Sequence, residues 1–160
     1  MAFNHFDHQG HAIMVDISAK APTLRRAVAS AEVCMRPEIL QEILDQKIAK
    51  GDVLSVARLA GISAAKQTPT LIPLSHPLAI HQVSIDFTPD LNSGILKITS
   101  DVSAMERSGM EMEAMVAASL AALTVYDMCK GSDKSICLKE TKLLYKEGGK
   151  SGVFIREAEQ

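Results

Sequence analysis

A predicted helix from Met110 to Lys130 ends in an acid and a base that are three residues apart, Asp127 and Lys130. Side chains at this spacing lie on the same face of a helix. The helix macrodipole disfavours a carboxylate in the last turn, and apolar surroundings raise its pKa unless Lys130 compensates. Such a pair suits general acid–base chemistry. The alternative is an ordinary ion pair at a helix end, which the spacing alone favours.

Two other positions carry groups that could move protons or bind anions. Lys50 precedes Gly51 at a predicted junction between helices, where it either complements a helix dipole or is presented by a tight turn. His76 lies between Pro73 and Pro77 in an otherwise apolar segment. Prolines restrict this loop and reduce the entropy lost in forming a site, so they favour a functional histidine over a buried structural one.

Two carboxylates stand at the start of the same long helix, Glu111 and Glu113. Ser108 and Glu111 have the spacing of a capping box, in which a hydroxyl and a carboxylate cap the first turn, and this favours a structural role for Glu111. Glu113 is not needed for the box, so we expect it to face either a ligand or solvent.

Neither end of the chain carries a recognisable phosphate or metal motif. The segment from Lys146 to Gly152 is rich in lysine and glycine, but Leu144 stands where a P-loop requires glycine. Its lysines either wrap a phosphate or belong to a solvated tail. His5, His8 and His11 recur every three residues without cysteine partners, and a frayed tail is favoured over a metal site.

A mixture of strands and helices must position these groups. Hydrophobic periodicity predicts helices over residues 37–50, 53–66 and 110–130. It predicts strands over residues 12–17, 24–35, 83–87, 96–100 and 136–145, although the alanines of 24–35 would also suit a helix. Residues 68–77 hold three prolines and are predicted to form an irregular loop. This order indicates a single α+β domain, an antiparallel sheet packed with helices, with ferredoxin-like elements.

Composition narrows the class of protein. The 160 residues are 47% hydrophobic with a net charge of −2, which gives a sizeable core and no basic excess for binding nucleic acid. The uncharged, apolar stretch from Ala114 to Tyr126 is shorter than the roughly 20 residues of a membrane-spanning helix. Three cysteines without CxxC spacing suggest free thiols in the cytoplasm. We expect frayed ends at 1–12 and 156–160 around one domain, 13–155.

Taken together, ordered motifs give a more specific indication than any single residue. They are Lys50 to Val53, Ala57 to Ile62, Leu71 to Leu78, Gly109 to Ala114, Leu123 to Lys130 and Gly148 to Gly152. In this order and spacing the chain resembles the MoaC family, the cyclic pyranopterin monophosphate synthases of molybdenum cofactor biosynthesis, from about Met14 to Phe154. The domain 13–155 is therefore expected to be a MoaC-like catalytic domain.

The resemblance implies a lyase. The family converts (8S)-3',8-cyclo-7,8-dihydroguanosine 5'-triphosphate, which a separate radical enzyme makes from GTP, into cyclic pyranopterin monophosphate and pyrophosphate. Proton transfers, hydrolysis and phosphoryl chemistry require several acid–base groups and no redox cofactor. The resemblance implies no metal ligands and no resident cofactor, leaves open whether Mg²⁺ accompanies the triphosphate, and implies a homohexamer, a trimer of dimers, with sites at the dimer interface.

The resemblance also assigns roles to residues of this chain. Asp127 matches the catalytic aspartate of the family, Lys50 and Lys130 match its catalytic lysines, and His76 matches the histidine of its Pro-Leu-Cys-His-Pro loop. The positions that match substrate-binding residues are Leu74, Ser75, His76, Met112, Glu113, Lys20, Arg25 and Lys146. Ser75 replaces the usual cysteine of the family, which argues that no thiol chemistry is needed there.

The mechanistic hypothesis joins these residues in one polar cavity, closed within a subunit or between two. Asp127 and Lys130 form a pair whose proton position is set by burial, Lys50 and His76 move protons at the ring being opened, and basic side chains hold the triphosphate. One alternative is a non-catalytic oligomeric protein that binds a pterin or nucleotide. Another is a hydrolase of GTP itself, resembling GTP cyclohydrolases, which commonly need a Cys/His metal site.

Overall fold

The central strand of the molecule is built from alternating small apolar residues. In the computed structural model, which describes residues 6–157, this strand is β1 (Thr23–Cys34). Ala27, Ala29, Ala31 and Val33 are buried on one face of β1, because successive side chains of a strand point to opposite faces. The strand predicted over 24–35 is confirmed, and its alanines provide a thin layer onto which helices pack closely.

Five strands form one antiparallel sheet in the order β2-β3-β1-β4-β5. The other four strands are β2 (Gln82–Asp90), β3 (Ile95–Glu106), β4 (Cys137–Glu147) and β5 (Phe154–Ile155). β3 lies between β1 and β2 and runs against both, so β1 and β2 are parallel with a strand inserted between them. This split β-α-β arrangement confirms the expected α+β fold with ferredoxin-like elements.

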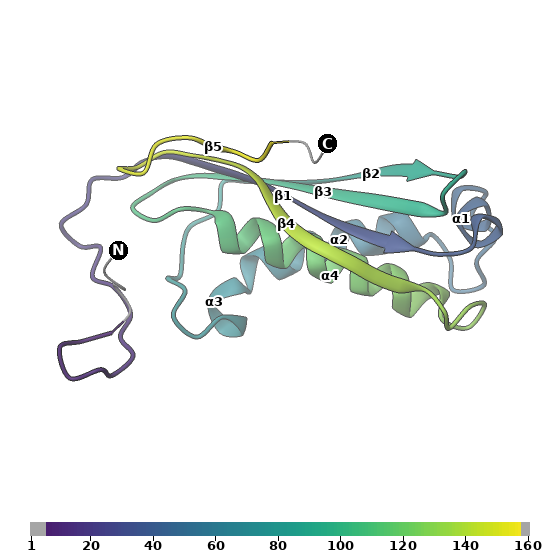
Figure 1. The fold of residues 1–160 in the computed structure, drawn as a ribbon, viewed down its shortest axis with the longest axis horizontal. Coiled ribbons are helices and arrows are strands. Elements are labelled where there is room, and N and C mark those ends of the chain that lie inside the picture. The colour runs from purple at the N-terminus through teal and green to yellow at the C-terminus, as the bar shows by residue number, and fades with distance from the viewer. Residues whose placement is uncertain (1–5, 158–160) are drawn as a thin grey trace.

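The helices cover one face of this sheet (Figure 1). They are α1 (Pro37–Leu44), α2 (Val53–Lys66), α3 (Thr68–Leu71) and α4 (Glu111–Cys129). α2 and α4 pack against each other at Gly61, where a Cβ atom would lie 3.0 Å from the backbone oxygen of Ala117 and 3.2 Å from the Cβ of Ala121. Small residues therefore allow the close helix packing that their presence predicts.

α4 is the core helix of the domain. Its 19 residues are long and apolar enough to cross a membrane by length and composition, but half of the apolar window is buried inside the molecule. Ala114, Ala117, Ala118 and Ala121 are fully buried, and α4 contacts β1, β3, β4 and α2. These contacts are those of a helix that packs in the core of an α+β domain.

Of the elements predicted in the first 50 residues, one strand does not form and one helix is shorter than predicted. Residues 12–17 form no strand: Ala12 makes an isolated bridge to Phe6, and the backbone oxygen of Val15 bonds to a side chain instead of a neighbouring strand. The helix predicted over 37–50 ends at Leu44, because Gln46 adopts a left-handed φ of +56°, which a continuing helix cannot accommodate.

Two local predictions further along also fail. The loop predicted over 68–77 begins with a helical turn, α3, in which Pro69 stands in the first turn, where its missing N–H is not required. The capping box of α4 does not form, because Met110 is the N-cap residue and makes no side-chain cap. His5 and residues 158–160 lie outside the described residues, so the predicted frayed ends there remain predictions.

Candidate active site

Lys50, Asp127 and Lys130 meet at the C-terminal end of α4. The Nζ of Lys130 lies 2.6 Å from Oδ1 of Asp127, and the Nζ of Lys50 lies 3.2 Å from Oδ2 of the same carboxylate. Lys50 also donates a hydrogen bond of 2.7 Å to the backbone oxygen of Asp127. These three residues are called the lysine–aspartate cluster below.

The elements on either side explain why the cluster forms. Asp127 stands in the last turn of α4 and Lys130 is its C-cap residue, so both point from the same helix end. The last carbonyls of a helix lack intrahelical donors, and Lys50 supplies one. Lys50 comes from the turn between α1 and α2, just before Gly51, whose φ of +104° suits glycine.

The electrostatics of the cluster differ from the sequence-based hypothesis. The side chains of Lys50, Asp127 and Lys130 are 47%, 55% and 50% exposed, so burial within one protomer does not set the proton position. Hydrogen bonds and charges from Lys130 and Lys50 lower the pKa of Asp127, and Asp127 raises the pKa of Lys130. Asp127 lies on the outer side of the last turn of α4, whose other residues Val125, Met128 and Cys129 are buried in the core. The cluster is an ionised carboxylate flanked by two amines.

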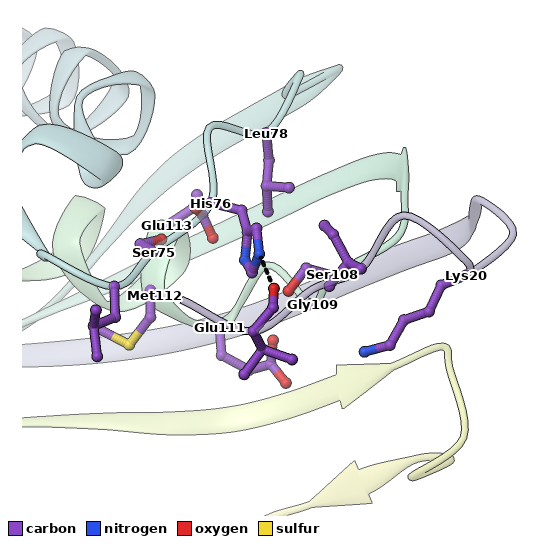
Figure 2. Close-up of a pocket in the computed structure, with 12 residues that line it drawn as sticks. Lys20, Ser75, His76, Leu78, Ser108, Gly109, Glu111, Met112 and Glu113 are labelled. Carbon is purple, nitrogen blue, oxygen red and sulfur yellow. Dashed lines mark hydrogen bonds between the residues drawn. The ribbon is translucent and has the colours of Figure 1, made fainter. Parts of the chain in front are cut away.

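A cavity of about 400 Å³ opens at the other end of α4. It is lined by the segment before β1, the loop after α3 and the first turn of α4 (Figure 2). The lining residues predicted to bind substrate are Lys20, Leu74, Ser75, His76, Met112 and Glu113. The structure thus brings together six of the eight predicted substrate-binding residues around this cavity, the α4 N-terminal pocket.

His76 connects two walls of this pocket. Its Nε2 lies 2.7 Å from the backbone oxygen of Val15, so Nε2 carries the proton and donates to that carbonyl. In the neutral ring Nδ1 is then the acceptor. His76 therefore holds the segment before β1 against the loop after α3, and a structural role coexists with any role toward a ligand.

Glu113 is the most unusual ionisable group of the pocket. Its residue is 2% exposed, and among the described residues its Oε1 has no hydrogen-bond partner. Burial raises the pKa of Glu113 to about 7, with a smaller contribution from the charge of Glu111. The sequence left open whether Glu113 faces a ligand or solvent; the structure places it inside, next to the pocket, with a proton it can hold or release near neutral pH.

Of the basic residues predicted to hold the triphosphate, Lys20 lines this pocket, whereas Arg25 and Lys146 are not among its lining residues. Arg107 donates to the backbone oxygen of Lys20 at 2.8 Å, and Arg25 donates to the backbone oxygen of Arg107 at 3.3 Å. The guanidinium of Arg25 also packs over Gly149, where a Cβ atom would overlap it. Lys146 lies in β4, next to β1, with its amine hydrogen-bonded to Ser151.

Sequence reasoning missed part of this surface. Arg107, Val15, Ile17 and Ser108 contribute to the pocket or its basic border without having been proposed for it. The sequence marks Ser108 only as a helix cap, and no pattern marks Arg107, although it lies two residues before the motif that begins at Gly109. Val15 and Ile17 have no sequence signal for a site, because only the fold brings them to the loop after α3.

Within one protomer the lysine–aspartate cluster and the α4 N-terminal pocket lie far apart. Glu113 and Asp127 belong to the same helix, and fourteen residues of α helix rise about 21 Å. The expectation that His76 joins Asp127 in one cavity is therefore not met within a subunit. Among residues 6–157, no three His, Cys, Asp or Glu side chains are placed to hold a metal ion.

Comparison with known proteins places this arrangement in a family. The MoaC family model matches residues 14–149. The chain is 66% identical to the cyclic pyranopterin monophosphate synthase of Geotalea uraniireducens, and the match covers the full length of both proteins. It is 64% identical to the protein of the same name from Pelobacter propionicus, again over the full length of both. It is 52% identical to the protein of that name from Chloroflexus aurantiacus, covering 95% of this chain and 93% of the relative. The chain belongs to the MoaC family.

Proposed function

We propose that this chain is a cyclic pyranopterin monophosphate synthase, a lyase of molybdenum cofactor biosynthesis. It converts (8S)-3',8-cyclo-7,8-dihydroguanosine 5'-triphosphate to cyclic pyranopterin monophosphate and releases pyrophosphate. The observation that carries the proposal is the lysine–aspartate cluster, intact in a chain that is 66% identical over its whole length to a relative of that name. The family resemblance supplies the reaction, and the geometry supplies groups able to perform it.

The lysine–aspartate cluster provides the proton chemistry. The lowered pKa of Asp127 keeps its carboxylate ionised, so it can accept a proton from the substrate at neutral pH. The ammonium of Lys130 can donate a proton or stabilise negative charge on a phosphoryl oxygen. Lys50 stands on the other side of the carboxylate and provides a second amine for the same purposes.

The α4 N-terminal pocket provides the binding of the ring system. A guanine-derived ring presents adjacent N–H donors, and a carboxylate accepts two such bonds at once. Glu113 is buried beside the pocket with an oxygen that has no partner among the described residues, so these donors would satisfy it. Met112 and Leu74 offer apolar contacts to the ring. Lys20 lines the pocket and Arg25 bonds to the backbone oxygen of Arg107, so these two basic side chains are the proposed contacts to the triphosphate.

A second subunit completes the site. Because the pocket and the cluster stand about 21 Å apart on one α4, a substrate of nucleotide size cannot reach both within a protomer. We propose the homohexamer, a trimer of dimers, in which the cluster of one subunit faces the pocket of its partner. Exposed apolar residues on α4 support such burial, with Leu123 50% exposed and Met112 38% exposed.

The cellular setting belongs to the same proposal. We place the protein in the cytoplasm, where its three cysteines would stay reduced. Its reaction directly follows that of the radical enzyme that makes its substrate. The reaction needs no resident cofactor in this scheme, and Mg²⁺ would enter with the triphosphate.

The test is turnover of the cyclic substrate by the purified protein. Release of pyrophosphate together with the cyclic phosphate product is expected. Asp127→Asn should lower kcat by about 10²-fold or more, in the range of general acid–base catalysis. Asp101→Asn is the matched control, because Asp101 of β3 also pairs with a basic side chain, Arg26 at 2.6 Å, and belongs to neither the cluster nor the pocket.

Other outcomes identify the competing functions. Binding of the cyclic substrate without pyrophosphate release would indicate the non-catalytic pterin- or nucleotide-binding protein. Turnover of plain GTP would indicate the hydrolase. Near wild-type rates in Asp127→Asn would remove the catalytic role of the cluster.

A further inference from the structure

Two cysteines that the proposed reaction does not use face each other across the sheet. Cys34 is the last residue of β1, Cys137 is the first residue of β4, and the register of the two strands pairs them directly. Directly opposed residues of antiparallel strands have Cα atoms about 4.5–5.5 Å apart and side chains on the same face. This separation lies within the roughly 4.4–6.8 Å range that a disulfide spans.

The pair lies on the face of the sheet opposite the helices. Val33, the neighbour of Cys34, is fully buried in the core, so the alternation of β1 directs Cys34 to the other face. The two thiols interact: Cys137 contributes, by its charge and by a side-chain hydrogen bond, to raising the pKa of Cys34, after the larger effect of burial. Cys34 is partly buried and Cys137 is exposed.

The chain around the pair holds both strand ends in place while the thiols are reduced. Arg36 bonds through Nε to Oδ2 of Asp133 at 2.9 Å, which ties the residues after β1 to the residues before β4. Asp133 in turn accepts a bond of 2.8 Å from the backbone nitrogen of Ser135. An ordered pair of strand ends favours an intramolecular bond between the thiols over a bond to a second molecule.

We propose that Cys34 and Cys137 form a reversible disulfide by exchange with a small-molecule disulfide. The exposed thiolate of Cys137 attacks one sulfur of the small disulfide, forming a mixed disulfide and releasing one small thiolate. The thiolate of Cys34 then attacks the sulfur of Cys137, forming the protein disulfide and releasing the second small thiolate. The two protein thiols are oxidised by two electrons, and the small disulfide is reduced to two thiols.

The Cys34–Cys137 disulfide would restrain the connection between α4 and β4, which begins with Lys130 of the lysine–aspartate cluster. Residues 130–136 link the end of α4 to Cys137, and Lys130 is the first of them. A covalent bond from Cys137 to β1 fixes the far end of this connection. The third cysteine, Cys129, is fully buried in the core, where burial raises its pKa to about 11, so it is protected from the same exchange.

The experiment uses the full chain, reduced and then equilibrated with oxidised glutathione before alkylation, digestion and mass spectrometry. The expected product is a cross-linked pair of peptides containing Cys34 and Cys137, with Cys129 alkylated only after unfolding. Thiol titration in denaturant should fall from three thiols to one and return to three after reduction. The oxidised chain should migrate as a monomer on a non-reducing denaturing gel.

Variants decide whether the pair acts as a unit. Cys34→Ser should leave Cys137 as a stable mixed disulfide with glutathione, because the second thiol is lost. Cys137→Ser should leave Cys34 largely reduced. The proposal is overturned if the wild-type chain accumulates the mixed disulfide at Cys137 as fully as Cys34→Ser does, or if Cys137 links two chains instead. Neither result depends on the lyase activity.

Discussion

The carboxylate of Asp127 lies between two amines, and that position determines its charge. Opposite charges within hydrogen-bond distance lower a carboxyl pKa more than partial burial raises it, so Asp127 is ionised in the isolated protomer. Glu113 shows the reverse balance, because burial without a cation raises its pKa to about 7. Two acids on one helix are thus set to different charge states, a separation that acid–base enzymes use.

Glu113 should make the stability of the protein depend on pH. Its pKa is about 7 in the folded chain against an ordinary value of 4.5, so between these values the unfolded chain ionises while the folded chain stays protonated. This residue therefore destabilises the fold increasingly as pH rises from 4.5 to about 7, and constantly above that. Glu113→Gln should gain free energy of unfolding relative to wild type between pH 4.5 and 8.

The measurement is urea unfolding of both proteins at fixed protein concentration, at pH 4.5 and pH 8. All other titrating groups are shared and cancel in the difference. An unfolding free-energy difference that does not change between the two pH values would show that the pKa of Glu113 is not raised in the folded protein.

His76 should have a structural effect that can be separated from catalysis. Loss of its bond to the backbone oxygen of Val15 in His76→Leu should speed amide hydrogen exchange in residues 13–20. His76→Gln keeps a side-chain donor and should restore much of that protection while activity stays low, if the ring moves protons. His81→Leu is the control, because His81 is exposed. Unchanged exchange in His76→Leu would show that the tether is not what orders the segment.

At the scale of elements, the close packing of α2 on α4 positions both candidate sites. α2 follows the turn that presents Lys50, and α4 carries Glu113 at one end and Asp127 at the other. The crossing depends on Gly61, since a Cβ atom there would lie only 3.0–3.2 Å from the backbone oxygen of Ala117 and the Cβ of Ala121, so the helices would have to move apart to admit a side chain. Tight packing holds the sites with little freedom to adjust.

Gly61→Val should therefore destabilise the domain by about 2–3 kcal/mol, as overpacking does in well-packed cores. Helix propensity alone predicts that Gly61→Val stabilises the domain, because glycine is a poorer helix former than valine by about 0.3 kcal/mol. Ser63→Val, at an exposed position of the same helix, is the matched control and should change stability by less than about 0.5 kcal/mol. Thermal or urea unfolding measures both. Equal effects in the two variants would mean that α2 shifts away from α4 at little cost.

At the scale of the whole molecule, local patterns predicted the elements better than their ends. The alternation in β1 and the long apolar run of α4 were sufficient to predict these two elements, because burial of those residues decides the structure. The end of α1 and the cap of α4 were mispredicted, because single residues such as Gln46 and Met110 adopt conformations that no hydrophobic pattern encodes. The Cys34–Cys137 pair depends on strand register, which the sequence does not show.

The same limit applies to the candidate site. Asp127 and Lys130 could be paired from their spacing, whereas the approach of Lys50 needs the turn before α2. The pocket around His76 needs the segment before β1 to cross the loop after α3. The separation of pocket and cluster along α4 follows from helix length, but only the fold shows that no other element brings them together in one subunit.

The central claim is that one catalytic site combines the cluster of one subunit with the pocket of another. The direct test mixes two inactive proteins, Asp127→Asn and Glu113→Gln, under conditions that allow subunits to exchange. In a two-fold dimer each mixed pair has one intact site, so random mixing should restore about a quarter of wild-type activity.

The control mixture combines Asp127→Asn with Lys130→Gln, which alter the same cluster, so no mixed pair has an intact site. Pyrophosphate release from the cyclic substrate is the measurement, with differently tagged subunits used to verify exchange. The account predicts recovered activity in the first mixture and none in the second. Verified exchange without recovery in the first mixture would contradict it.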